Sequence, residues 1–339
     1  MITTHDFDAA ARRQRAGLTA DGRDDELLIR CAVLAASSHN TQPWTFRADA
    51  GSITIRPDIE RRCSVVDPDD AHLYKSLGCA AENVVHAAAT QGLDASVRFE
   101  PTDDAVVIDL TPTVRTASTD LFDAIAARQC TRLEFDGTPV HADELAQLEL
   151  AGSGTGARTI VITDRDVLAT IADLVADGNQ VQLTDRAFRR ELLAWIRFNP
   201  AAALRSGDGL AGRCSKNPPL PTWLGRLLAP VVITARSQSN RDRANISSSA
   251  GIAVVVTEHD DEAAWVDAGR TYERFALQAT ALDIRTAFVN QPIEVAALRC
   301  RFEELLELDG EHAQLAVRFG HADAAPYSLR RPISDVFDT

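Results

Sequence analysis

The stretch "AASSHNTQPWTFR", residues 35–47, joins a predicted helix to a predicted strand and carries an unusual density of polar side chains. Before it, Leu27, Leu28, Cys31 and Leu34 recur with the spacing of one helical face. After it, "WTFRADAGSITIRP" alternates apolar and polar residues around the turn-like "ADAGS", which predicts a β-hairpin. Helix and strand formation alone do not require so many hydrogen-bonding groups at their joint.

The rest of the chain predicts a mixed α and β protein. Helical periodicity marks further segments at 70–92, 119–130, 141–151, 165–177, 184–198, 262–282 and 294–308. Apolar runs of strand length occur at 104–110, 158–163, 251–258 and 313–320. The predicted fold class is α+β.

The acidic composition narrows the classes of function. A formal charge of −14 over 339 residues would repel a phosphate backbone, so we expect no nucleic-acid partner. No apolar run approaches the roughly 18 residues of a membrane span, and the N-terminal "MITTHDFDAAARRQR" lacks a secretory apolar segment. We therefore expect a cytoplasmic protein with no membrane partner. The six scattered cysteines and eight histidines predict neither disulfides nor a metal site.

Two motif-like stretches lack the context that their chemistry requires. "GSGTGA" at 152–157 follows a predicted helix and precedes a strand, the reverse of a phosphate-binding turn. Ser37 and Ser38 lie beside His39, but no G-x-S-x-G motif is present, and chain neighbours seldom form a nucleophile and base pair. Neither stretch predicts a catalytic site.

Two internal similarities predict a repeat. "GCAAENVVHAAATQGLD" from Gly78 resembles "GRTYERFALQATALDIR" from Gly269, at an offset of 191 residues. "DELLIRCAVLAA" at 25 and "DELAQLELAGSG" at 143 share a helix start at an offset of 118. The difference of 73 residues predicts an insertion in the second copy, between about 165 and 245. The alternative is that such short identities arise by chance.

Arginine clusters are informative because they oppose the negative average charge. Arg128 and Arg132 are four residues apart, so we expect them on one face of a helix end, where two guanidiniums suit a phosphate. Arg330 and Arg331 in "SLRRP" are a second candidate anion site. The alternative for both clusters is structural ion pairing. A third cluster is interpreted as a solvated connection: Arg236, Arg241 and Arg243.

Four segments together resemble the nitroreductase superfamily. They are "ASSHNTQPW", "RQCTR" after "LFDAIAA", "WVDAGRTYERFALQATAL" and the ending "RFGHADAAPYSLRRPISDV". The resemblance is greatest to the Acg-like branch, flavoprotein relatives typical of mycobacteria, and covers nearly the whole chain except residues 183–245. In this superfamily a homodimer binds FMN at the subunit interface, with an arginine motif from one subunit and the serine, asparagine and glutamine joint from the other.

The resemblance implies a dimer folded within one chain. The joint occurs only in the first half of the sequence, whereas "RQCTR" and "LRRP" occur only in the second. We therefore expect an internal duplication with two nitroreductase-like lobes, residues 1–117 and 118–339. A lid-like insertion at about 183–245 is expected in the second lobe, and the monomer is expected to act as a pseudo-dimer.

The resemblance also implies a flavin site with two halves. The side chains expected to hydrogen-bond the isoalloxazine and ribityl groups are Ser37, Ser38, Asn40 and Gln42. The phosphate is expected to be held by Arg128, Cys130, Arg132, Arg330 and Arg331, where Cys130 replaces a usual small hydroxyl residue. Asn290 and Gln291 in "FVNQP" are expected near the flavin N5 edge. No catalytic side chain is expected, because the cofactor carries the chemistry.

The implied activity is that of an FMN-dependent oxidoreductase. Hydride would pass from NAD(P)H to flavin N5 and on to an electron-poor acceptor such as a nitroaromatic or quinone. One alternative is a protein that stores or sequesters FMN under the insertion without turnover. Another is an interaction protein that has lost the flavin.

Overall fold

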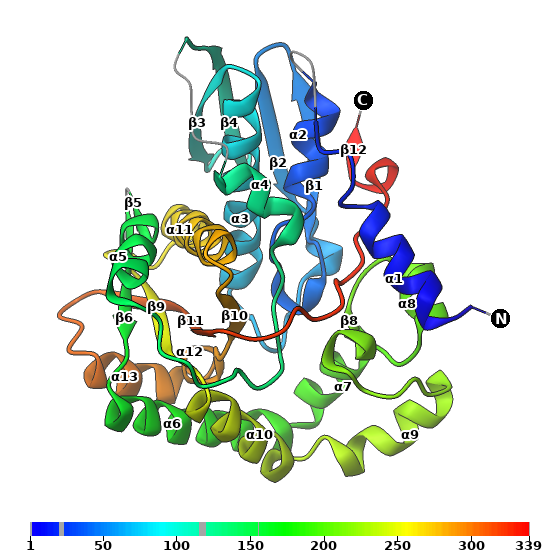
Figure 1. The fold of residues 1–339 in the computed structure, drawn as a ribbon, viewed down its shortest axis with the longest axis vertical. Coiled ribbons are helices and arrows are strands. Elements are labelled where there is room, and N and C mark those ends of the chain that lie inside the picture. The colour runs from blue at the N-terminus through cyan, green and yellow to red at the C-terminus, as the bar shows by residue number, and fades with distance from the viewer. Residues whose placement is uncertain (1, 20–23, 115–119, 155, 339) are drawn as a thin grey trace.

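The computed structural model describes residues 2–19, 24–114, 120–154 and 156–338. Two five-stranded sheets lie on either side of a central pair of helices, α3 (Ala71–Thr90) and α11 (Glu262–Ala281) (Figure 1). The chain is therefore an α+β protein, as predicted. The predicted boundary between residues 117 and 118 falls outside the described residues.

The first sheet has the strand order β12-β1-β2-β4-β3. Its strands are β1 (Trp44–Asp49), β2 (Ser52–Pro57), β3 (Leu93–Glu100), β4 (Ala105–Pro112) and β12 (Phe337–Asp338). The hairpin predicted after the joint is confirmed, because β1 pairs antiparallel with β2. Ile53 and Ile55 are fully buried and Arg56 is exposed, as the alternation requires. β12 comes from the far end of the chain and pairs parallel with β1.

The second sheet has the strand order β10-β11-β9-β6-β5. Its strands are β5 (Ser153–Gly154), β6 (Ala157–Ile162), β9 (Gly251–Thr257), β10 (Arg285–Phe288) and β11 (His312–Gly320). β9 is buried along its whole length because both of its faces are covered. Ile252, Val254 and Val256 join a core with α6 and α13, whereas Val255 faces the central helices.

The two sheets share one topology. Four strands have the order β1-β2-β4-β3 in the first sheet and β6-β9-β11-β10 in the second, and every neighbouring pair is antiparallel. A central helix follows the second strand in both. Residues 50–51 connect β1 to β2, whereas residues 163–250 connect β6 to β9. The longer connection overlaps the range in which the sequence predicts an insertion; the duplication and the insertion stay predictions.

The central helices cross at two glycines. A Cβ built on Gly78 would lie 2.0 Å from the carbonyl oxygen of Val266, and one on Gly269 would lie 1.9 Å from that of Lys75. Gly78 and Gly269 are 191 residues apart in the chain, and so are Lys75 and Val266. The crossing is thus reciprocal, as the contact of two subunits about a two-fold axis would be.

The remaining helices surround these layers. In chain order they are α1 (Thr4–Arg13), α2 (Asp25–Ala32), α4 (Asp120–Ala127), α5 (Ala142–Ala151), α6 (Arg165–Thr184), α7 (Arg186–Trp195), α8 (Pro200–Ser206), α9 (Thr222–Val232), α10 (Ala235–Ser247), α12 (Gln291–Glu294) and α13 (Ala296–Leu305). Short 3₁₀ segments are η1 (Ser38–Asn40), η2 (Ile59–Arg61), η3 (Gly212–Ser215) and η4 (Ile333–Asp335). Two further strands, β7 (Ile196–Arg197) and β8 (Leu210–Ala211), pair with each other within the segment between β6 and β9.

Two expectations from the sequence are wrong. Residues 235–247 form the helix α10 rather than a solvated connection, because Asn245 and Ile246 pack inward while the arginines point out. Helix α4 ends at Ala127, so Arg128 and Arg132 do not share a helical face. Cys130 instead forms an isolated parallel β-bridge with Thr286.

We expect Gly78→Ala and Gly269→Ala each to lower the free energy of unfolding by about 1–3 kcal/mol or more, because the added methyl group meets a backbone carbonyl that cannot move alone. Urea unfolding measures the change. Gly212→Ala is the matched control, since its Cβ would lie 3.6 Å from the nearest atom. Wild-type stability in both helix variants would contradict the close crossing.

Candidate functional site

The joint between α2 and β1 has an unusual backbone. His39, Asn40 and Gln42 adopt positive φ angles of 48°, 56° and 54°. Non-glycine residues seldom adopt this conformation, and each instance costs on the order of 1–3 kcal/mol. The surrounding hydrogen bonds must therefore hold the joint in place.

Asn40 ties the joint to two distant segments. Its Nδ2 donates to the carbonyl oxygens of Gly209, at 3.1 Å, and Leu329, at 3.2 Å. Its Oδ1 accepts from Nη1 of Arg330 at 3.0 Å. The segment between β6 and β9 and the C-terminal segment thus meet on one side chain.

Gln42, two residues after Asn40, connects the joint to the same two segments and is fully buried. Its backbone N–H donates to Ser37 Oγ at 3.1 Å, and its Nε2 donates to the carbonyl oxygen of Gly207 at 2.9 Å. Its Oε1 accepts from the backbone N–H of Arg331 at 2.8 Å. The Arg331 guanidinium donates to the Gln42 carbonyl oxygen at 3.1 Å and to Asp58 at 3.3 Å.

Arg330 caps the end of α2 from the C-terminal segment. Its guanidinium donates to the carbonyl oxygens of Val33 at 2.7 Å, Leu34 at 2.9 Å and Ala35 at 3.2 Å. Its Nη1 has the acceptors Asn40, Ser328 and Leu329. Burial lowers the pKa of this guanidinium well below its usual value. All five N–H groups have protein acceptors, so this arrangement leaves none for a ligand.

Arg128 is also held inside the protein. Its Nε lies 2.8 Å from Glu273 Oε1, and its Nη2 donates to the carbonyl oxygen of Leu34. Both charged side chains are almost fully buried, at 3% and 0% exposure. Burial alone would lower the pKa of the Arg128 guanidinium, but the Glu273 carboxylate outweighs it and raises that pKa. Burial also raises the pKa of Glu273, against the opposing charge of Arg128. The pair joins α11 to the end of α2.

Arg132 differs from the other predicted arginines. It is exposed, and its guanidinium makes no hydrogen bond or ion pair with any described residue. The neighbouring Thr131 donates its backbone N–H to Thr286 at 2.9 Å, but its buried Oγ1 has no partner among the described residues. Arg318 donates through Nη2 to the Thr131 carbonyl oxygen at 3.1 Å, while its Nη1 is also unpartnered. Residues 130–132 thus lie beside hydrogen-bond donors that bind no acceptor among the described residues: the Arg132 guanidinium, Thr131 Oγ1 and Arg318 Nη1.

His39 contacts its neighbours in the joint, and its pKa responds to the charge of Arg132. Its Nδ1 lies 3.4 Å from Ser38 Oγ and 3.7 Å from Cys63 Sγ. Burial, and then the positive charge of Arg132, lower the pKa of His39 to about 4. Burial raises the pKa of the Cys63 thiol. At neutral pH both groups are uncharged, so Arg132 is the positive charge at this contact.

A buried polar cluster lies at the start of α3. His72 Nε2 is 3.6 Å from Glu294 Oε1, and Gln182 Nε2 donates to Glu294 Oε2 at 2.6 Å. Burial raises the pKa of Glu294 to about 7. Lys75 is 4% exposed and makes no hydrogen bond or ion pair with a described residue. Burial lowers its pKa to about 7, against the opposing charge of Asp67.

Asn290 and Gln291 lie at the start of α12, on the far side of this cluster. Asn290 Oδ1 accepts from the backbone N–H of Ala316 at 2.9 Å. Gln291 Nε2 lies 3.3 Å from Asp242 Oδ2 and 3.4 Å from Asn179 Oδ1. The buried Oε1 of Gln291 has no partner among the described residues. The same helix carries Glu294, which reaches His72 of α3.

The structure thus brings most predicted residues together. Residues 37–42 contact 330–331 directly, Arg128 reaches the same helix end, and the charge of Arg132 acts on His39. Within the described part of the chain, the side chains of Asn290 and Gln291 make no hydrogen bond with the other predicted residues, and Glu294 of the same helix reaches His72 of α3.

Sequence reasoning missed the groups that long-range folding assembles. These are His39, His72, Lys75 and Glu294. One signal was available, because Lys75 is one of only two lysines in the chain, while the other 33 basic residues are arginines.

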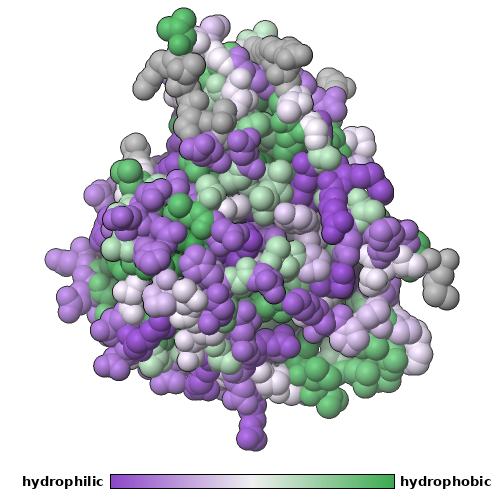
Figure 2. Space-filling model, in the orientation of Figure 1, coloured by the Kyte–Doolittle hydropathy of each residue, from purple (hydrophilic) through white to green (hydrophobic). Residues whose placement is uncertain are grey.

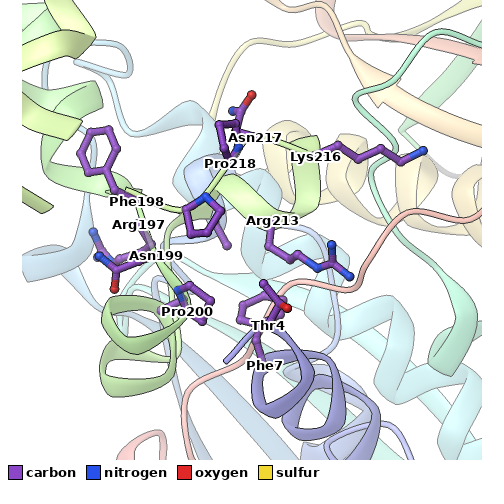
Figure 3. Close-up of a pocket in the computed structure, with 13 residues that line it drawn as sticks. Thr4, Phe7, Arg197, Phe198, Asn199, Pro200, Arg213, Lys216, Asn217 and Pro218 are labelled. Carbon is purple, nitrogen blue, oxygen red and sulfur yellow. The ribbon is translucent and has the colours of Figure 1, made fainter. Parts of the chain in front are cut away.

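A separate pocket of about 350 Å³ lies between α1, α8 and η3 (Figure 3). Phe7 and Thr4 face Pro200 and Arg213 across it. None of the predicted site residues lines it. Arg213 is paired with Asp8, at 2.7 Å, and Arg197 with Asp208, at 2.6 Å, whereas Lys216 makes no ion pair with a described residue.

The family model and the related proteins that match this chain point to the same family. Residues 125–321 match the nitroreductase family. "Putative NAD(P)H nitroreductase Rv3131" of Mycobacterium tuberculosis is 30% identical over 332 residues, covering 94% of this chain and 92% of that protein. "Putative NAD(P)H nitroreductase acg" of the same organism is 26% identical and covers 91% of this chain and 93% of its own.

Solved structures superpose in part. A nitroreductase with bound FMN from Bacteroides fragilis is 15% identical, covers 63% of this chain and 95% of its own, and has a TM-score of 0.39. An NADPH:FMN oxidoreductase from Vibrio harveyi complexed with NAD⁺ is 14% identical, covers 62% and 73%, and has a TM-score of 0.38.

We expect Lys75→Met to stabilise the protein most at or below pH 7. The folded protein releases the Lys75 proton near its lowered pKa of about 7, whereas the unfolded chain keeps it to near the usual lysine pKa of 10.5. The unfolded chain therefore holds more protons between these two pH values. Wild-type stability therefore rises with pH across this window, by at most roughly 1.4 kcal/mol per pH unit, relative to the variant.

Urea unfolding of wild type and Lys75→Met from about pH 6.5 to about pH 9.5 measures the difference in their free energies of unfolding. We expect this difference to become smaller as the pH rises. Lys216→Met is the matched control, because it removes the other lysine from an exposed position. A difference between wild type and Lys75→Met that does not change with pH would contradict a buried amine of lowered pKa.

Proposed function

The chain belongs to the nitroreductase family, and from that premise we propose that it is an FMN-binding oxidoreductase that uses NAD(P)H to reduce an electron-poor acceptor. Nitroaromatics and quinones are the acceptor class we propose. FMN, when bound, supplies the two-electron chemistry. The protein's own residues have to bind it, orient it and balance its charge.

The donors left unused by the protein support this proposal. Arg132 is exposed and unpaired, and its neighbours Thr131 Oγ1 and Arg318 Nη1 have no partner among the described residues. A guanidinium that keeps its charge and donates two parallel bonds suits a phosphate. We propose that Arg132 binds the phosphate, with Cys130 beside it.

We propose a different role for the side chains whose hydrogen-bonding groups are bound to other protein groups. Asn40, Gln42, Arg330 and Arg331 hold the left-handed joint rigid, so Ser37 and Ser38 are presented in a fixed geometry. Arg128 positions α11 against the same joint through Glu273. We propose that these residues act on the flavin site by shaping it, because their donors bind protein acceptors.

We propose that the Lys75 ammonium stabilises negative charge on a molecule bound at the site. It is the buried ammonium of this region without a protein partner among the described residues. A donor in a water-poor site stabilises developing anionic charge more than one in water does. A bound anion would raise the Lys75 pKa from about 7 and keep the amine protonated.

The observation that carries the proposal is the position of Arg132. It follows Cys130, which bridges to Thr286 of the second sheet, and its positive charge lowers the pKa of His39 in the joint that enters the first sheet. These observations support a phosphate-binding cation between the two sheets.

Sequestration of FMN without turnover is the second candidate, and one set of contacts favours it. Glu191 of α7 accepts the backbone N–H groups of Val65 at 2.9 Å and Val66 at 3.0 Å. Asp208 pairs with Arg61 and, at 2.6 Å, with Arg197. The segment between β6 and β9 is therefore fastened to the loop beyond β2, next to His39 and Cys63, as a cover would be.

We expect the full chain to bind FMN and Arg132→Gln to weaken that binding about 10- to 100-fold, since a hydrogen bond to a charged group contributes roughly 1.5–3 kcal/mol. Quenching of flavin fluorescence on titration measures the affinity. Arg12→Gln, an exposed arginine of α1, is the charge-matched control. Equal affinity in wild type and Arg132→Gln would remove Arg132 from the site.

We expect the FMN-loaded protein to oxidise NADPH steadily with a soluble quinone. Glu191→Ala separates the two candidates, because it releases the segment between β6 and β9 from residues 65–66. A working reductase turns over with or without Glu191, whereas a sequestering protein turns over only in the variant. Glu149→Ala, an exposed glutamate of α5, is the control. No flavin reduction in any variant would contradict the oxidoreductase proposal.

A further inference from the structure

Helix α9 exposes its apolar face. Trp223 is 69% exposed, Leu227 65%, Val231 76% and Val232 63%. These residues recur at intervals of about four and therefore form one stripe along the helix. A surface helix of a globular protein normally turns such a stripe toward the core.

The inner face of α9 carries small residues instead. Gly225 and Ala229 are buried, and a Cβ on Gly225 would lie 2.4 Å from the ring of Phe198. The helix therefore packs closely on one side while its large side chains point away from the protein. Rotating the stripe inward would bring those side chains into a space sized for glycine.

A groove of about 510 Å³ lies between α9, α7 and the end of α6. Its apolar lining includes Leu183, Leu192, Leu193, Pro230 and Ile233. Its basic lining consists of Arg186, Arg189, Arg190 and Arg226. We call the exposed face of α9 together with this groove the α7–α9 face.

The arginines of the α7–α9 face have no internal partner. None of the four makes a side-chain hydrogen bond or ion pair with a described residue. Residues 183–245 contain eleven arginines and lysines but only four aspartates and glutamates, in a chain whose formal charge is −14. This segment is therefore a positively charged region on an acidic protein.

Figure 2 shows hydrophobic residues gathered at the lower right, over α9, where Figure 1 places the free edge of the molecule. Charged side chains and an apolar stripe with a tryptophan thus occur side by side. No helix of the described residues is long and apolar enough to cross a membrane. The absence of a membrane partner expected from the sequence rested on that criterion, which does not apply to a helix lying on a surface.

We propose that the α7–α9 face docks on an anionic lipid surface. Trp223, Leu227 and Val231 enter the boundary between head groups and acyl chains, and the arginines contact the lipid phosphates. Amphipathic helices with basic residues beside an apolar stripe bind membranes in this way, and tryptophan favours the interfacial depth. The arginines of this face make no ion pair with a described residue, so on an otherwise acidic protein they favour its orientation toward a negatively charged surface.

Vesicle flotation of the full chain tests the proposal. We expect binding to vesicles of equimolar phosphatidylglycerol and phosphatidylcholine, and little binding to pure phosphatidylcholine. Arg186→Gln with Arg190→Gln is expected to weaken partitioning by up to about 30-fold, since each basic residue near the surface contributes roughly 1 kcal/mol. Trp223→Ser is expected to weaken it through loss of the apolar contact.

Matched controls keep the test specific. Arg12→Gln with Arg13→Gln removes two exposed arginines from α1, and Leu150→Ser removes an apolar side chain that is 77% exposed on α5. Both are expected to bind vesicles as wild type does. A blue shift of tryptophan fluorescence on binding, lost in Trp223→Phe, reports contact at α9 without depending on stability.

Three results would overturn the proposal. One is equal binding to anionic and neutral vesicles, or to neither. Another is an equal loss in the α1 control, which would indicate attraction to the whole surface. The third is self-association of the chain that Trp223→Ser abolishes without any vesicle binding, which would assign the α7–α9 face to a second copy of the protein.

Discussion

The close crossing of α3 and α11 is the constraint on which the rest of the structure depends. Gly78 and Gly269 let the two backbones touch, and their contacts with Val266 and Lys75 are reciprocal, as contacts about a two-fold axis would be. The sheets can then share one core across the helices. The same approach places Glu273 against Arg128 and the end of α2, so the joint of the first sheet and residues 128–132 of the second meet.

Buried charges fix that meeting point. The Arg330 guanidinium donates its hydrogen bonds to carbonyl oxygens at the end of α2 and to Asn40. The Arg331 guanidinium donates to the carbonyl oxygen of Gln42. The positive φ angles of the joint are stable because these contacts over-determine them. Among the arginines predicted from the sequence, this leaves Arg132 free of partners among the described residues, and the proposed flavin site depends on that distinction.

The features that could be predicted were those indicated by the spacing of apolar residues along short segments of the sequence. The hairpin after the joint and the long central helices follow from alternation and helical spacing. The duplication suggested by the 191-residue offset between Gly78 and Gly269, and the insertion with it, stay predictions. Helix α9 was missed because Gly225 and Pro230 mask its pattern and its apolar residues face outward. The cluster of Lys75, His72 and Glu294 joins helices more than 200 residues apart in sequence, and no local signal encodes such a contact.

The central claim is that one chain builds one flavin site from its two halves. The most direct test is the molar ratio of bound FMN to chain, measured by absorbance and quantitative amino-acid analysis on a fraction whose mass is determined by light scattering. The account predicts one FMN per chain in the monomer. Two FMN per chain, or one FMN shared by two chains, would contradict it, and so would a monomer that binds none.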